Sequence, residues 1–180
     1  MSLSIAPLTA ADAPAYRALM LEAYAQAADA FTSTAEERAG EPLAWWVARI
    51  GTADGLQQCF GAFEAGQLVG SVALEFAHKP KTRHTGLLIG MYVRPGARRL
   101  GAGRALLQAA VAAAAARPGL RLLSLTVTEG NEAALGLYRA AGFVAWGVQP
   151  LAIRTPSGYK GKVHMAMQWP GGAEAAAGAA

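Results

Sequence analysis

The sequence predicts a single α/β domain built around a β-sheet. Helix-like and strand-like segments alternate along the chain without an internal repeat. The 180 residues are enough for one domain with a full-sized core. The apolar content of 53% is raised by alanine, and no run reaches the roughly eighteen consecutive apolar residues that a membrane-spanning helix requires. We therefore expect neither a membrane protein nor a membrane partner.

The N-terminal part predicts a strand and two helices. The strand covers Leu3 to Leu8, and the segment from Thr9 to Asp12 resembles a capping box with Asp in place of Glu, opening a helix through about Ala27. Residues 29–41 mix Thr, Ser, Glu and Gly, which predicts a loop. A second, tryptophan-bearing helix follows and ends near Gly51.

The middle of the chain predicts three strands. Gln58 to Phe63 and Leu68 to Phe76 flank a four-residue connection that contains glycine, so they are expected to form a β-hairpin. The polar, basic segment from His78 to His84 predicts a loop before the strand from Thr85 to Val93. An alanine-rich helix ending near Arg117 comes next.

The C-terminal part predicts a strand, a helix and two final strands. Leu120 to Thr128 is rich in Leu, Val and Thr, and the helix that follows has Asn131 at its N-cap. The last strands are expected at 143–148 and 162–168. Between them, residues 154–162 predict a flexible basic loop.

The segment from Met91 to Leu107 carries the strongest functional signal. It is predicted to form a strand, a tight glycine-bearing turn and the first turns of the alanine-rich helix. Gly101 and Gly103 remove side chains where the helix begins, so backbone N–H groups stay open to an anion. Three arginines add positive charge that suits a diphosphate: Arg98, Arg99 and Arg104. The segment is neither a dinucleotide fingerprint, whose third glycine would replace Leu106, nor a Walker loop, which requires Gly-Lys-Ser/Thr.

Two motifs resemble one enzyme family. Arg-x-x-Gly-x-Gly after a strand is similar to the acyl-CoA pyrophosphate loop of the Gcn5-related N-acetyltransferases (GNAT). Asn131-x-x-Ala-x-x-Leu-Tyr138-x-x-x-Gly142-Phe143 resembles the other diagnostic segment of that family. Both follow a predicted strand and occur in the family's order, so the chain is identified as a member.

The resemblance implies a specific fold and extent. It covers residues 1–169 and implies a three-layer domain with a central mixed, mostly antiparallel sheet of about seven strands flanked by about four helices. The glycine- and alanine-rich residues 170–180 are expected to be a disordered tail.

The resemblance also implies a reaction, the transfer of an acetyl group from acetyl-CoA directly to a primary amine of a small metabolite or a protein. In the family, the pantetheine arm lies between the strand that carries Met91 and the strand that ends near Thr128. The residues implied to bind acetyl-CoA are Met91, Tyr92, Val93, Arg98, Arg99, Leu100, Gly101, Ala102, Gly103, Arg104, Asn131 and Tyr138.

Tyr138 matches the family tyrosine that donates a proton to the departing CoA thiolate. By spacing alone it would be a helix aromatic packed in the core, and the motif match reverses that preference. Asn131 matches the asparagine that contacts the arm, and its alternative role is a plain N-cap.

The general base is less defined. An alkylamine is mostly protonated at neutral pH, so a group must take its proton. The two positions where relatives carry a glutamate hold Leu87 and Thr126 here. We name Glu75 and His84 as catalytic candidates. Glu129 or a water relay past the threonines of the strand before Asn131 are alternatives.

The acceptor amine has its own candidate residues. Four acidic residues could attract a cationic amine, and two tryptophans could contact it through an apolar or cation–π surface: Asp29, Glu36, Glu37, Glu41, Trp45 and Trp46. For most of them a solvated acidic turn and core tryptophans are the preferred interpretation.

Charge and cysteine content limit the other partners. The net charge of +4 comes from scattered basic residues without an aromatic–basic repeat, so it fits the phosphates of CoA better than a nucleic acid. The one cysteine, Cys59, excludes a disulfide framework and a thiolate metal cluster and is expected to be a small buried hydrophobe. No secretory signal is apparent, so we expect a cytoplasmic protein without a metal cofactor. Pairing of the C-terminal strands in relatives suggests a homodimer.

Two other functions stay open. The chain could be a non-catalytic CoA-binding or sensing module, because both family base positions lack a carboxylate. It could also use another acyl-CoA or a non-amine acceptor on the same scaffold.

Overall fold

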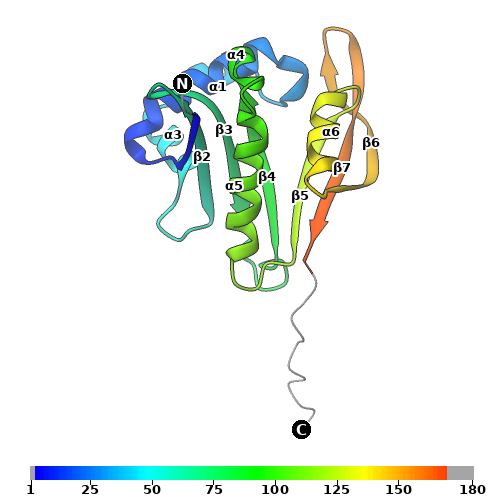
Figure 1. Ribbon diagram of the computed structural model, residues 1–180. Helices are drawn as coiled ribbons and strands as arrows, with labels where there is room; N and C mark the ends of the chain where they lie inside the picture. Colours follow the sequence, from blue (N-terminus) through cyan, green and yellow to red (C-terminus); the bar gives the residue numbers. More distant parts are fainter. Residues whose placement is uncertain (1–2, 170–180) are drawn as a thin grey trace.

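A seven-stranded sheet forms the middle layer of the protein (Figure 1). The computed structural model describes residues 3–169, so the tail predicted for residues 170–180 lies outside the described residues. The strands are β1 (Leu3–Pro7), β2 (Gln57–Glu64), β3 (Gln67–Phe76), β4 (Thr85–Val93), β5 (Leu122–Thr128), β6 (Val144–Thr155) and β7 (Gly158–Gln168). Their order across the sheet is β1-β2-β3-β4-β5-β7-β6. Only β4 and β5 run parallel, which confirms the predicted mixed, mostly antiparallel sheet.

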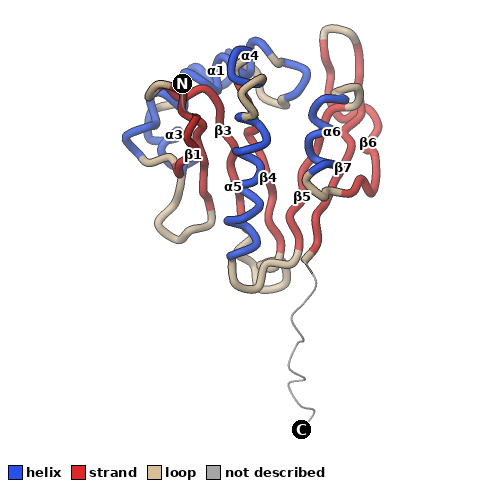
Figure 2. The backbone as a smooth tube through the Cα atoms, viewed as in Figure 1, coloured by secondary structure: helices blue, strands red, loops and turns tan. Residues whose placement is uncertain are grey.

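Helices cover the sheet from both sides (Figure 2). They are α1 (Ala13–Gln26), α2 (Ala35–Ala39), α3 (Leu43–Ile50), α4 (Pro95–Arg98), α5 (Ala102–Ala116) and α6 (Glu132–Ala140). α5 and α6 pack on one face, and α1 and α3 pack on the other. None of these helices, within residues 3–169, is long and apolar enough to cross a membrane.

The two faces hold separate cores. Beneath α5 and α6, Leu106, Leu107 and Leu123 are almost completely buried. On the other face, α1 and α3 bury Trp46 against a cluster that includes Cys59. Cys59 is therefore the small buried hydrophobe that the sequence predicted.

Local capping explains how the first helices start. The amide and hydroxyl of Thr9 both donate to the Asp12 carboxylate at 2.8 Å, which confirms the shortened capping box before α1. The loop predicted for residues 29–41 is wrong in part, because α2 lies inside it. Thr34 and Glu37 cap that helix reciprocally, with amide donors at 2.7 and 3.2 Å. A helix of five residues is too short to show a helical period in the sequence.

The flexible loop predicted for residues 154–162 is also wrong. β6 and β7 run almost into one another, and only Pro156 and Ser157 separate them. The hydroxyl of Thr155 donates to the carbonyl of Gly158 at 2.9 Å and closes the turn. The basic, glycine-bearing composition of this hairpin is typical of a loop, although the residues pair along nearly their whole length.

The sheet opens between β4 and β5. Their pairing covers only Thr85–Leu122, Gly86–Leu123 and Leu87–Ser124, and beyond these pairs the strands diverge (Figure 1). On the β3 side of β4 the register shifts, so that Gly90 and Met91 together face one β3 residue. Gly90 has a φ of 62°, which favours glycine, and such a bulge bends a strand locally.

Candidate active site

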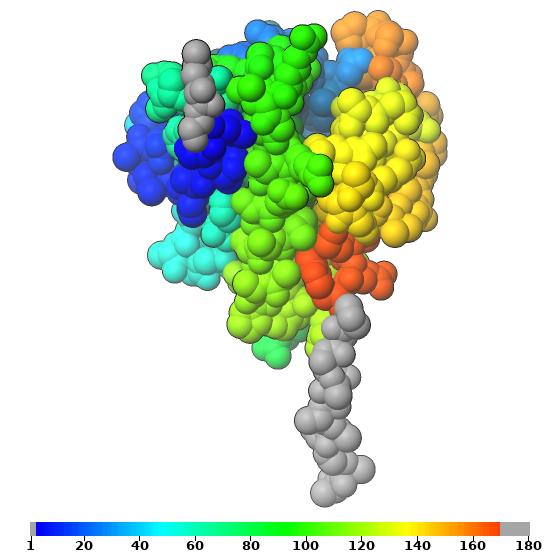
Figure 3. All heavy atoms as spheres, viewed as in Figure 1, coloured from blue at the N-terminus to red at the C-terminus, as the bar shows by residue number. Residues whose placement is uncertain are grey.

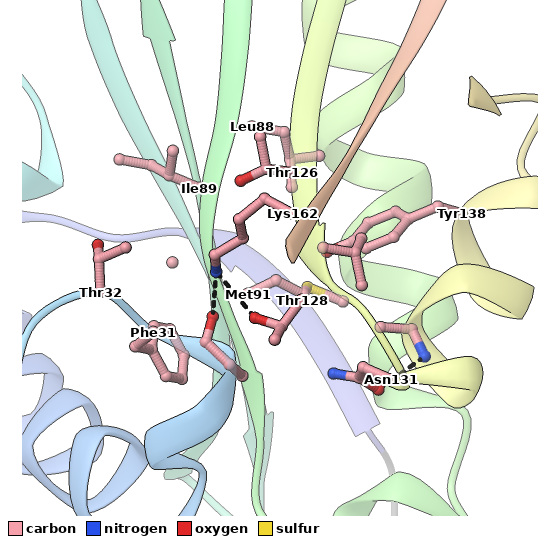
Figure 4. Close-up of a pocket in the computed structure, with 14 residues that line it drawn as sticks. Phe31, Thr32, Leu88, Ile89, Met91, Thr126, Thr128, Asn131, Tyr138 and Lys162 are labelled. Carbon is pink, nitrogen blue, oxygen red and sulfur yellow. Dashed lines mark hydrogen bonds between the residues drawn. The ribbon is translucent and has the colours of Figure 1, made fainter. Parts of the chain in front are cut away.

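A pocket occupies the opening between β4 and β5 (Figure 4). It is lined by residues from β4, β5, α6, β7 and the segment that follows α1: Ala30, Phe31, Thr32, Leu88, Ile89, Gly90, Met91, Thr126, Val127, Thr128, Asn131, Ala134, Tyr138 and Lys162. Its volume is about 190 Å³, below the roughly 300–1,000 Å³ of drug-sized ligand sites. The pocket by itself is therefore too small to enclose a whole drug-sized ligand.

A groove on the surface lies beside this pocket. α5 and α6 cover the same face of the sheet, and Figure 3 shows a hollow between the upper part of the green segment and the yellow α6. Part of the blue segment that follows α1 is visible at its floor.

Tyr138 extends from α6 into the pocket (Figure 4). Its side chain is buried, and its ring meets the ring of Phe143 edge-on at 5.8 Å between centroids. Burial raises the pKa of Tyr138 well above its ordinary value, so the hydroxyl keeps its proton at neutral pH. Tyr138 is thus both a packed aromatic residue and a protonated group at the pocket wall.

Asn131 caps α6 and also lines the pocket. Its side-chain oxygen accepts a hydrogen bond from the amide of Ala134 at 3.2 Å, which is the N-cap role predicted as one alternative. The side-chain amide nitrogen is directed away from the helix (Figure 4). Capping therefore uses the oxygen and leaves the nitrogen for a ligand.

The arginine-rich loop stands at the end of β4. The predicted tight turn contains the helical turn α4, so it is more structured than expected. Arg98, Arg99 and Arg104 are all exposed, and Arg98 donates from Nε to the carbonyl of Val93 at 2.9 Å. Ala102 is fully buried and fixes the start of α5 against the sheet.

The two glycines of this loop differ. Gly101 has a φ of 77°, a left-handed conformation that strains other residues. A Cβ on Gly103 would instead meet the side chains of Leu137 and Met91 at 3.7 Å, an ordinary contact. The backbone therefore requires glycine at 101, and nothing in the fold of the free protein requires it at 103.

The residues at the end of β4 point to opposite faces. Met91 lines the pocket. Tyr92 is directed toward α1, where its hydroxyl donates to the Glu22 carboxylate at 3.1 Å. The side chain of Tyr92 is thus directed away from the pocket, and Leu100 is half-exposed in the loop.

None of the three predicted base candidates is among the residues that line this pocket. Glu75 is paired with Leu87 on β4, in the stretch where that strand still pairs with β5. His84 precedes β4 and lines a separate hollow at the opposite end of the strand. The Glu129 carboxylate accepts from the amide of Gly161 at 2.8 Å. The assignment of Glu75, His84 or Glu129 as the general base therefore stays a prediction.

Lys162 was missed by the sequence reasoning because the predicted flexible loop included it. Its side chain is only 7% exposed, and among the described residues it is the one charged group in the pocket lining. Nζ donates to the hydroxyl of Thr128 at 2.9 Å and to the carbonyl of Ala30 at 3.4 Å (Figure 4). Burial lowers the pKa of Lys162.

Three of the four acidic acceptor candidates have structural partners. Asp29 pairs with Lys160 at 2.8 Å, and Glu41 pairs with Arg38 at 3.3 Å. Glu37 belongs to the α2 cap, and Glu36 lines a neighbouring hollow.

The tryptophan pair of α3 follows the preferred interpretation. Trp46 is fully buried, and Trp45 is partly exposed. The guanidinium groups of Arg38 and Arg49 lie 4.9 and 4.7 Å from the centre of the Trp45 ring. Elsewhere, within residues 3–169, no group of three or more His, Cys, Asp or Glu side chains is placed to hold a metal ion.

Comparison with known proteins agrees with this geometry. The profile of the acetyltransferase (GNAT) family matches residues 19–143. An acetyltransferase of the GNAT family from Streptococcus pneumoniae superposes with a TM-score of 0.78 at 26% identity, over 93% of this chain and 100% of that one. A Gcn5-related N-acetyltransferase from Kribbella flavida superposes with a TM-score of 0.77 at 27% identity, over 93% and 98%.

A third structure shares the fold at lower identity. The structure of yncA from Salmonella typhimurium with its cofactor acetyl-CoA gives a TM-score of 0.78 at 22% identity, over 98% of this chain and 99% of that one. No curated protein matches the chain in sequence. The profile match covers well over half of the chain and the fold agrees over nearly all of it, so the protein belongs to the acetyltransferase (GNAT) family.

Proposed function

We propose that this protein transfers the acetyl group of acetyl-CoA directly to a primary amine of a small metabolite or a protein. The observation that carries the proposal is the opening between β4 and β5, with Tyr138 at its wall and the arginine-rich loop at the end of β4. A structure that shares the fold holds acetyl-CoA.

The loop has the chemistry to hold a diphosphate. Gly101 turns the chain so that α5 begins with amides that carry no bulky side chain nearby, and a helix N-terminus favours negative charge. Arg99 and Arg104 are exposed beside it, and guanidinium groups bind phosphate oxygens in a bidentate manner. The diphosphate of acetyl-CoA would lie here, with its thioester arm reaching the pocket.

The opening between β4 and β5 would position the reactants. The lining residues Leu88 to Met91 belong to the part of β4 beyond its pairing with β5, where backbone groups can bond an extended ligand as a neighbouring strand would. Bound acetyl-CoA supplies an electrophilic thioester carbon. Holding it beside the amine contributes roughly 7–11 kcal/mol toward the barrier.

Tyr138 would complete the transfer. As the new C–N bond forms and the C–S bond breaks, the departing sulfur gains negative charge and needs a proton. Burial keeps the Tyr138 hydroxyl protonated, so it can donate to that sulfur. Asn131, about two helical turns before it, would contact the arm through its side-chain nitrogen.

The test combines binding and turnover. Calorimetry with acetyl-CoA should show binding, and release of the CoA thiol should rise when a panel of primary amines is added. The variants Arg99→Ala and Arg104→Ala should each weaken acetyl-CoA binding about tenfold, the value of one lost charge-assisted contact. Arg83→Ala, in the exposed loop before β4, is the matched control and should bind normally. Binding without thiol release for any amine would favour a non-catalytic CoA-binding module, and no binding would contradict both.

The homodimer also stays a proposal. β6 is an edge strand that exposes Val144, Trp146, Val148 and Leu151, a set of apolar side chains that an interface could bury. Light scattering at several protein concentrations tests it. The cytoplasmic location stays a prediction.

A further inference from the structure

Lys162 differs from the neighbouring lysine of the same strand. Lys160 forms an ion pair with Asp29 at 2.8 Å and is partly exposed. Lys162 is almost fully buried and bonds only to two uncharged oxygens, the hydroxyl of Thr128 and the carbonyl of Ala30. None of the ion pairs found within residues 3–169 includes Lys162.

The hydrogen bonds around Lys162 fix its donors. The Thr128 hydroxyl donates its hydrogen to the carbonyl of Asp29 at 2.6 Å, so it can only accept a hydrogen bond from Lys162. An ammonium group has three donors. Two of them are used by Thr128 and Ala30, and the contacts found among residues 3–169 leave the third for the pocket that Lys162 lines.

This arrangement is costly in the free protein. A buried charge loses hydration, and neutral oxygens replace that loss only in part. A buried ammonium that lines a pocket therefore gains most from a bound anion. The remaining lining is uncharged in the part of the chain that the structure describes, so the pocket has no carboxylate that would attract a second cation.

We infer that the acceptor amine carries a carboxylate, as an amino acid does, and that Lys162 binds this carboxylate. The inference rests on the proposed acetyl transfer. In Figure 4 the ammonium of Lys162 lies on the side of Phe31 and Thr32, whereas Tyr138 enters from the opposite side, from α6. The amine of a compact amino acid would then lie between its anchored carboxylate and the thioester next to Tyr138. Acceptors with several amines and no acid would place a second cation beside Lys162.

Matched acceptors test the inference directly. Initial rates of thiol release are compared for free amino acids and for the corresponding amino-acid amides, which keep the amine and the side chain but lack the carboxylate. The wild-type protein should prefer the acids, with KM values about 10- to 100-fold lower, the value of one hydrogen bond to a charged group. Equal KM values for acids and amides, or a preference for amides, would overturn the inference.

Three variants assign the preference to Lys162. Lys162→Met should abolish the discrimination mainly through KM for the acids and leave the amides unchanged. Lys162→Arg should restore part of it, because the charge returns. Lys81→Met, in the exposed loop before β4, is the control and should behave as the wild type. If Lys162→Met lowers kcat for acids and amides equally, the residue moves a proton and the carboxylate inference is wrong.

A binding measurement separates this inference from the proposed function. With CoA present, calorimetry compares N-acetylglycine with N-acetylglycinamide in the wild type and in Lys162→Met, with thermal unfolding as the check on folding. Tighter binding of the acid by the wild type alone supports the carboxylate site, even if no amine in the panel is acetylated. Equal binding of both compounds by the wild type would overturn it, even if acetyl transfer is found.

Discussion

The two halves of the sheet are built differently. Strands β1 to β4 form a continuous antiparallel unit that is covered on both faces, by α5 on one side and by α1 and α3 on the other. Strands β5, β7 and β6 are covered by α6 on one face, and on the other they expose apolar side chains such as Trp146. Within the sheet, the halves are paired through only three residue pairs of β4 and β5, as far as the described residues show.

The two halves contribute different residues to the pocket and its surroundings. The doubly covered half ends in the arginine-rich loop. The singly covered half supplies all the polar side chains of the pocket lining except Thr32: Thr126, Thr128, Asn131, Tyr138 and Lys162. The pocket at the junction thus has a mainly apolar wall from β4 on one side and polar side chains from β5, α6 and β7 on the other.

The largest expected contrast is between two tryptophans. Trp46→Ala removes a fully buried ring from the doubly covered half and should lower the free energy of unfolding by about 3–5 kcal/mol. Trp146→Ala removes a ring that is 67% exposed and should change it by at most about 0.5 kcal/mol. Urea unfolding at low protein concentration measures both. Similar losses for the two variants would contradict the comparison, and a Trp146 effect that grows with protein concentration would support the homodimer.

The second contrast separates turnover from stability. Tyr138→Phe keeps the ring contact with Phe143 but loses the proposed proton donor, so kcat should fall about 100-fold or more with little change in acetyl-CoA affinity or unfolding free energy. Tyr16→Phe, in the core beneath α1, should cost about 1 kcal/mol of stability and leave kcat unchanged. Steady-state kinetics and thermal unfolding of both variants measure the change in kcat and the change in stability. An unaltered kcat in Tyr138→Phe would remove Tyr138 from the mechanism.

The third contrast is the sign of the pH dependence in the two halves. Burial raises the pKa of Cys59 from 9.0 to about 12, so the folded protein holds a proton that the unfolded chain releases. This contribution to stability is complete below pH 9 and is lost as the pH rises to about 12, at up to about 1.4 kcal/mol per pH unit. Cys59→Ala should flatten the fall in unfolding free energy just above pH 9. An unchanged slope would show that Cys59 does not contribute.

Lys162, in the other half, has the opposite sign. Burial lowers its pKa below the ordinary 10.5, so the unfolded chain binds the proton more tightly and the group destabilises the fold at neutral pH. Lys162→Met should therefore keep or raise the free energy of unfolding at pH 7, and its advantage over the wild type should shrink as the pH rises toward 10.5. Denaturant unfolding at several pH values checks this. A large destabilisation by Lys162→Met at pH 7 would mean that the lysine is structural.

The smallest expected contrast lies at the junction, between the two loop glycines. Gly101→Ala forces a left-handed conformation on alanine and should cost about 1–2 kcal/mol. An alanine side chain fits at position 103, and alanine favours a helix more than glycine does. Gly103→Ala should therefore stabilise the protein by about 0.5–1 kcal/mol. If Gly103 instead serves the ligand, the same variant should weaken acetyl-CoA binding. Gly103→Ala with unchanged affinity would assign that glycine no role in binding.

Much of the fold could be predicted from local patterns. The hairpin of β2 and β3, the capping box before α1 and the Asn131 cap of α6 depend on neighbouring residues only, so they are visible in the sequence. The short helices α2 and α4 and the long β6–β7 hairpin were missed. Their composition is typical of loops, and tertiary contacts decide their conformation.

The site divides in the same way. By itself the sequence determined the glycine–arginine loop, the positions of Asn131 and Tyr138 and the family to which they belong, because these features follow one another along the chain in fixed spacing. Only the tertiary structure decided that Lys162 is buried beside Thr128 and that Glu75 and His84 lie away from the pocket lining. Burial and ion pairing arise between residues that are distant in sequence. Local spacing of residue types therefore does not specify which charged side chain forms an ion pair and which is buried beside uncharged oxygens.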